Sequence, residues 1–95
     1  MWPFSRPAPS GPPVAVTIYT KRDCPLCDEA KEVLAAAGRR HALEVAWVDI
    51  AGDPELEALY GLEVPVVFVA GRKRFFGHVS PALLEKAIVA ARGSA

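Results

Sequence analysis

The two cysteines of the chain, Cys24 and Cys27, lie three positions apart within the stretch KRDCPLCDEAK. A pair this close suits three kinds of site: a redox-active dithiol, half of a metal site, or two small residues of a core. At positions i and i+3 of a helix, the two Cα atoms come within the distance that a disulfide requires. The spacing therefore favours a pair that interconverts between dithiol and disulfide.

The residues around Cys24 favour a reactive thiol. Pro25 is typical of the first position of a helix, so Cys24 is expected at the helix N-terminus. There, unpaired N–H groups and the helix dipole stabilise a thiolate relative to a thiol. Lys21 and Arg22 act in the same direction, and Asp23 opposes them.

Cys27 lies one helical turn further on, where we expect it to be less exposed and less acidic than Cys24. Cys24 is therefore the predicted nucleophile, and Cys27 the thiol that resolves the mixed disulfide. A zinc site would need more ligands, and His78 lies too far from His41 for the usual histidine spacing. We expect both histidines at the surface or in turns, and an iron–sulfur cluster shared between two chains stays open as an alternative.

Length and composition indicate one small globular domain. The chain has 95 residues, 52% of them hydrophobic, and its 11 basic and 11 acidic side chains leave no net charge. This balance argues against attraction to nucleic acid or to an anionic membrane. No apolar run is long enough to span a bilayer, and prolines interrupt the N-terminal stretch where a secretory signal would be apolar. We therefore expect a cytoplasmic protein, whose thiols are kept reduced.

The hydrophobic pattern predicts elements in the order βαβαββα. Strands are expected over 14–19, 42–50, 64–69 and 73–76, and helices over 25–37, 53–60 and 80–91. The first two strands, joined through a helix, should be parallel with a right-handed crossover. The last two should form an antiparallel hairpin, with the final strand at an edge of the sheet.

Several residues are assigned more specific places. Gly38 is expected to end the first helix, Asp53 to cap the second, and Ser80 with Pro81 to begin the third. The apolar side of the third helix is predicted to consist of Leu83, Leu84, Ala87, Ile88 and Ala91. One face of the second strand is predicted to carry Leu43, Val45 and Trp47.

The domain is expected to span residues 14–92. Residues 1–13 contain five prolines, which predicts a flexible N-terminal tail, and residues 93–95 form a short C-terminal tail. The basic run of residues 72–74 is expected to be a solvated hairpin turn, with a docking patch as the alternative.

Two segments resemble known proteins. The pattern Y-T-x-x-x-C-P-x-C, from Tyr19 to Cys27, resembles the active-site signature of glutaredoxins, and DPELEALYGLEVPVVFV is similar to the segment of thioredoxin-fold proteins that leads to their cis-proline. From Val14 to Ala91 the chain resembles short bacterial glutaredoxin-like proteins. The resemblance implies an α/β thioredoxin fold, with a four-stranded mixed sheet of order 2-1-3-4 flanked by three helices. It also implies a cis bond between Val64 and Pro65.

The resemblance also implies where a substrate binds. In the family the cis-proline lies against the cysteine pair, and the backbone of the residue before it pairs with the substrate as a short strand. The expected substrate-binding residues are Val64, Pro65, Lys21, Arg22, Pro25 and Leu26. Glutaredoxins that bind glutathione commonly carry Tyr where Leu26 stands, and two glycines and an Asp where this chain has GHVS at 77–80.

Residues and resemblance together predict a monomeric thiol–disulfide oxidoreductase that acts on protein or glutathione mixed disulfides. We expect no resident cofactor and no metal, with glutathione as a possible cosubstrate and either glutathione or a reductase as electron donor. Neither nucleic acid nor a membrane is an expected partner. The alternatives are a redox-inert thioredoxin-fold binding module and an iron–sulfur cluster-bridged dimer.

Overall fold

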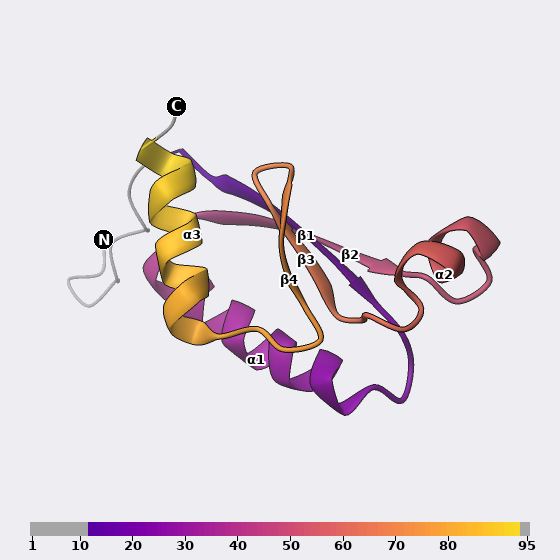
Figure 1. Ribbon diagram of the computed structural model, residues 1–95. Helices are drawn as coiled ribbons and strands as arrows, with labels where there is room; N and C mark the ends of the chain where they lie inside the picture. Colours follow the sequence, from indigo (N-terminus) through magenta and orange to yellow (C-terminus); the bar gives the residue numbers. More distant parts are fainter. Residues whose placement is uncertain (1–11, 94–95) are drawn as a thin grey trace, which may run out of the picture.

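The structure, a computed structural model, describes residues 12–93. The described chain contains β1 (Val14–Thr20), α1 (Pro25–Arg40), β2 (Leu43–Asp49), α2 (Pro54–Tyr60), β3 (Val66–Val69), β4 (Arg72–Phe76) and α3 (Pro81–Gly93), arranged as shown in Figure 1. The predicted βαβαββα order is confirmed. The predicted tails lie mostly outside the described residues, of which Pro12 and Pro13 precede β1 and Gly93 ends α3.

The strands form one mixed sheet in the order β2-β1-β3-β4. β1 runs parallel to β2 and antiparallel to β3, and β3 pairs antiparallel with β4. β1 and β3 are therefore central, and β3 is apolar throughout because both of its faces are covered. This topology confirms the predicted thioredoxin fold with strand order 2-1-3-4.

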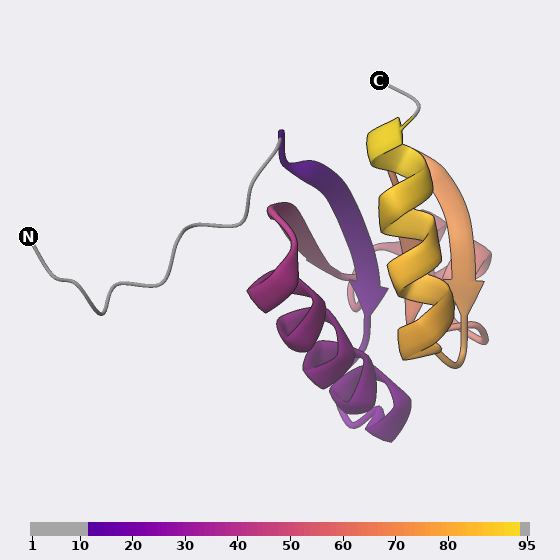
Figure 2. The same cartoon turned by 90° about the vertical axis from the view of Figure 1, so that its left-hand side faces the viewer.

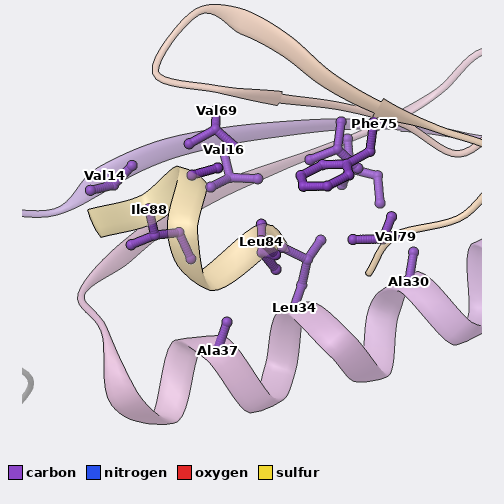
Figure 3. Close-up of a cluster of buried hydrophobic side chains, with 13 residues drawn as sticks. Val14, Val16, Ala30, Leu34, Ala37, Val69, Phe75, Val79, Leu84 and Ile88 are labelled. Carbon is purple, nitrogen blue, oxygen red and sulfur yellow. The ribbon is translucent and has the colours of Figure 1, made fainter. Parts of the chain in front are cut away.

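The hydrophobic core lies between the sheet and the pair α1 and α3. Figure 2 shows these two helices side by side on one face of the sheet. Alternate residues of β1 point into this core, and Leu34 of α1 and Leu84 of α3 lie close together in it (Figure 3). Both leucines are about 2% exposed or less, and burying a side chain of this size stabilises the fold by about 1.5–3 kcal/mol.

The opposite face of the sheet carries α2. Asp53 caps this helix by accepting hydrogen bonds from two backbone N–H groups, as predicted. The ring of Tyr60, the last residue of α2, lies 4.7 Å from the ring of Tyr19 in β1 and 6.2 Å from the ring of Phe68 in β3, measured between centroids. These three rings join α2 to the end of β1 that leads to the cysteines.

The structure corrects the predicted end of the first helix. Gly38 lies inside α1, which continues to Arg40 and is capped by His41. His41 lies in the bend that follows α1, and its side chain is only 11% exposed. Its Nε2 lies 2.6 Å from a carboxylate oxygen of Glu85 in α3, and its Nδ1 lies 3.3 Å from a guanidinium nitrogen of Arg92. Contacts with α3 thus hold α1 two residues beyond the glycine.

Two smaller predictions also change, and a third is confirmed. Leu83 is 54% exposed and does not belong to the apolar side of α3. The third strand begins at Val66, two residues later than the predicted start at position 64. The predicted shared face of the second strand is confirmed, since Leu43, Val45 and Trp47 pair with the core-facing residues of β1. Trp47 is nevertheless 46% exposed, and the ammonium of Lys31 lies 6.0 Å from its ring centroid.

Candidate dithiol site

The turn between β1 and α1 places Cys24 at the start of the helix. The chain leaves β1 at Thr20 and reverses at Asp23, whose φ of +54° is unusual for a residue other than glycine but tolerated by Asp. Cys24 is the N-cap of α1 and has an extended backbone, and Pro25 follows in the first turn. The proline suits this place because it lacks an N–H group that the helix would leave unpaired.

Cys24 and Cys27 form a disulfide, with their Cα atoms 5.2 Å apart. The backbone N–H of Cys27 donates a hydrogen bond to Sγ of Cys24, at 3.1 Å. The sulfur of Cys24 therefore takes the place that a serine or aspartate oxygen commonly has at a helix N-cap. After reduction, the same N–H and the helix dipole would favour the thiolate form of Cys24.

The two cysteines differ in exposure. Cys27 is 2% exposed and packs in the interior, whereas Cys24 is half-buried. A partner molecule therefore reaches Cys24 more easily. The two residues between them, Pro25 and Leu26, are both exposed, Leu26 to 43%.

Charged side chains surround a pocket of about 320 Å³ next to the turn. Its lining residues are Thr20, Lys21, Arg22, Asp23, Asp28, Lys31 and Asp49. The charges are mixed, so the pocket is not an anion site as a whole. Lys21 lies 3.6 Å from a carboxylate oxygen of Glu57 in α2, whereas Arg22 is exposed. Of the two predicted basic residues, Arg22 is therefore the one with more freedom to meet a partner.

The bond between Val64 and Pro65 is cis, as the resemblance implied. Pro65 is fully buried and Val64 is half-buried. The N–H of Gly77 lies 2.9 Å from the carbonyl oxygen of Glu63 and 3.0 Å from that of Pro65. These hydrogen bonds attach the segment to the end of β4 through the residues on either side of Val64.

Two supporting features were not predicted from the sequence. Lys73 forms an ion pair with Glu63, at 2.7 Å, and its ammonium lies 5.3 Å from the ring centroid of Phe76 and 5.9 Å from that of Tyr60. The middle residue of the basic run 72–74 therefore braces the cis-proline segment. Glu63 lies in the turn after α2 and Lys73 lies in β4, ten residues further along the chain, and the return of the chain through β3 and β4 brings them together.

Comparison with known proteins supports these observations. The family model for the glutaredoxin-like domain (DUF836) matches residues 15–89. The chain belongs to this glutaredoxin-like family. The match covers β1 to most of α3 and includes both cysteines and the cis-proline.

Solved structures of related proteins agree with this assignment. The X-ray structure of protein XcR50 from X. campestris is 38% identical, with a TM-score of 0.69, and the match covers 80% of this chain and 97% of XcR50. Protein Ne2328 from Nitrosomonas europaea is 22% identical and also has a TM-score of 0.69. The match covers 81% of this chain and 93% of Ne2328. A mutant thioredoxin from Halobacterium salinarum shares the fold at 21% identity, with a TM-score of 0.62. The match covers 83% of this chain and 74% of the thioredoxin chain.

The glutaredoxin-like domain, the thioredoxin fold and the disulfide-bonded CxxC pair together support a thiol oxidoreductase in general. Within residues 12–93 no three His, Cys, Asp or Glu side chains are grouped so that they could hold a metal ion. No helix of that part of the chain is long and apolar enough to cross a membrane.

Proposed function

We propose that the protein is a cytoplasmic, monomeric thiol–disulfide oxidoreductase that acts on protein or glutathione mixed disulfides. The observation that carries this proposal is the placement of the Cys24–Cys27 disulfide at the N-terminus of α1, with the more accessible sulfur at the cap. No metal or resident cofactor takes part in the proposed reaction, and Cys24 and Cys27 supply both electrons.

In the first step the Cys24 thiolate attacks one sulfur of the substrate disulfide. The substrate S–S bond breaks, its second sulfur leaves as a thiolate and takes a proton, and Cys24 becomes joined to the substrate. In the second step the Cys27 thiolate attacks Sγ of Cys24 and expels the remaining substrate thiolate. The substrate gains two electrons, and the protein ends with its internal disulfide. Two thiols of glutathione, or a reductase dithiol, then return the pair to the reduced form.

The surroundings of Cys24 support roles for the other predicted residues. Val64 would pair through its backbone with an extended substrate segment, beside the buried ring of Pro65. Arg22 would attract an anionic group, and Lys21, tied to Glu57, would act mainly through its charge. Pro25 and Leu26, both exposed, would form the rim that a substrate contacts next to the sulfur.

A protein disulfide suits this surface better than glutathione alone. Besides Leu26, Leu62 is fully exposed and Phe76 is 60% exposed, and both lie next to residues that hold the cis-proline segment in place. Exposed apolar side chains of this kind favour contact with an apolar protein segment. The glycine pair and the acid that hold glutathione in related glutaredoxins are absent from residues 77–80.

The test is intact-mass analysis of alkylation-trapped protein across glutathione redox buffers. We expect reversible conversion between the dithiol and the internal disulfide, with a midpoint that gives the reduction potential. A glutathione adduct would accumulate in Cys27→Ser but not in Cys24→Ser. If both thiols stay reduced at every ratio, the redox function is wrong and a binding module remains. Colour in protein purified without air would instead indicate a cluster-bridged dimer.

A further inference from the structure

The end of the molecule opposite Cys24 carries three arginines around two adjoining hollows. Figures 1 and 2 place the start of β1, the turn between β3 and β4 and the end of α3 at this end, and the start of α1 at the other. One hollow, of about 190 Å³, includes Arg92 in its lining. The other, of about 210 Å³, includes Arg72 and Arg74. Ala70 and Ala91 line both hollows and so join them.

One edge of the Arg92 guanidinium has no partner among the described residues. Nη1 lies 3.3 Å from Nδ1 of His41, whereas Nε and Nη2 are buried and form no hydrogen bond there. The Nε–Nη2 edge presents two parallel N–H groups, the arrangement that binds a carboxylate or phosphate through two hydrogen bonds. Burying charged donors without a partner costs free energy, so an oxyanion at this edge would be stabilising.

His41 and Glu85 lie on the Nη1 side of the guanidinium. A guanidinium only donates hydrogen bonds and a carboxylate only accepts them. The contacts of 2.6 Å from Nε2 to Glu85 and 3.3 Å from Nδ1 to Arg92 place the His41 ring between these two groups. Glu85 also accepts a hydrogen bond from Arg40 at 3.0 Å. Glu85 is thus occupied by two other groups, and Nη1 lies beside His41, while the opposite edge is buried without a partner among the described residues.

The charge around the hollows is positive and locally unbalanced. None of the described residues that line either hollow is acidic. Arg72 and Arg74 are exposed, and neither forms an ion pair with another residue of the described chain. Apart from the arginines, the lining is small or apolar, with alanines where the hollows meet, which leaves room for a compact ligand.

We propose that this end of the protein binds a small oxyanion, a phosphate or carboxylate group. The Nε–Nη2 edge of Arg92 donates two hydrogen bonds to it, and Arg72 and Arg74 add positive charge at the neighbouring hollow. Arg92 is partly exposed and lines its hollow, but Nε and Nη2 are buried, so binding requires the guanidinium to turn this edge toward the ligand. The site is separate from the cysteines and does not depend on the proposed redox function.

The test is an NMR titration of the full-length ¹⁵N-labelled protein with inorganic phosphate, and in parallel with acetate, at ionic strength held constant with chloride. We expect saturable shifts at the amides of Ala70 and Ala91 and at Nε of Arg92. Tighter binding of phosphate would assign the site to phosphate groups, and tighter binding of acetate to carboxylates. Shifts that do not saturate with either anion, or that centre on Cys24, would overturn the proposal.

Variants distinguish binding by the two parallel donors of Arg92 from attraction by its charge alone. Arg92→Lys keeps the charge but loses the two parallel donors, so we expect binding to weaken by about tenfold. Lys86→Gln removes a charge from the exposed side of α3 and should leave the affinity unchanged. Equal affinities for Arg92→Lys and the wild type would refute the assignment. The double variant Arg72→Gln with Arg74→Gln gives a second test. Both positions are exposed, so the fold should be preserved, and we expect the affinity for the anion to fall by about threefold.

Discussion

The two ends of α1 are capped in different ways. At its start, Sγ of Cys24 accepts the N–H of Cys27, so the capping group is also the group proposed to react. At its end, His41 is the cap, and Glu85 and Arg92 hold its side chain against α3. The sulfur that caps the first end also forms a disulfide, which can be reduced and re-formed. The cap at the other end joins two helices of the core. Stability and reactivity are therefore separated along one helix, and changes at each end should affect different measurements.

The largest effect is expected for Cys24→Ser. A serine oxygen caps a helix well, so the unfolding free energy should stay close to that of the reduced wild type. Disulfide reduction should fall by at least about a thousandfold, because the nucleophile is lost. The measurement is the rate of reduction of a mixed-disulfide peptide, together with chemical unfolding under reducing conditions. Undiminished activity would disprove the role given to Cys24.

The second effect concerns the other end of α1. We expect His41→Ala to lower the unfolding free energy by about 1–3 kcal/mol, because the substitution removes hydrogen bonds of two charged groups. Activity per folded molecule should not change. His78→Ala is the matched control, since His78 is exposed, and it should stay within about 0.5 kcal/mol of the wild type. Equal urea midpoints for the two variants would contradict the proposed helix bridge.

The third effect is the response of stability to acid. Hydrogen bonds from His41 and then from Arg40 lower the pKa of Glu85 below its usual value of 4.5. A carboxyl with a lowered pKa in the folded state stabilises the fold above its unfolded pKa and loses this contribution as the pH falls through its folded pKa. Glu85→Gln should therefore lose stability near neutral pH and vary less below pH 4.5. Parallel curves of stability against pH for the two proteins would rule out this linkage.

The smallest effect is expected at Asp23, which lies next to the nucleophile. Asp23→Asn removes a negative charge and keeps a side chain that tolerates the φ of +54°. At about 7 Å in water one charge is worth about 0.6 kcal/mol, so the alkylation rate of reduced Cys24 at neutral pH should rise by about two- to threefold. Glu32→Gln, an exposed change further along α1, should leave the rate unchanged. A slower reaction in Asp23→Asn would show that the carboxylate assists the thiol.

Local patterns in the sequence were enough to predict the order of the elements. The alternation of β1, the apolar run of β3, and the caps at Asp53 and Ser80 depend on neighbours a few residues away. The cis bond before Pro65 came from the resemblance alone, since X–Pro bonds are mostly trans in folded proteins. The position of the cysteines at the helix start followed from Pro25 and the preceding strand.

The misplaced end of α1 and the ion pair that was not predicted both depend on contacts between separate parts of the fold. Gly38 is a plausible helix end when only its neighbours are considered, but His41 meets Glu85, which is 44 positions away in sequence, and the helix continues. The ion pair between Lys73 and Glu63 likewise requires the return of the chain through β3 and β4. Neither contact has a signal in the spacing of nearby residues, because each is set by how the elements pack.

The light attachment of α2 has a consequence for hydrogen exchange. None of the seven residues of this helix is fully buried, and its contacts with the sheet depend largely on the ring of Tyr60. Segments with few buried contacts open locally at a lower free energy than the rest of a domain. The amides of α2 should therefore exchange with solvent through separate, low-energy openings, while the amides of β1 and β3 exchange only when the whole domain unfolds. Since Lys21 is paired with Glu57 in this helix, each such opening would also release a positive charge beside the cysteines.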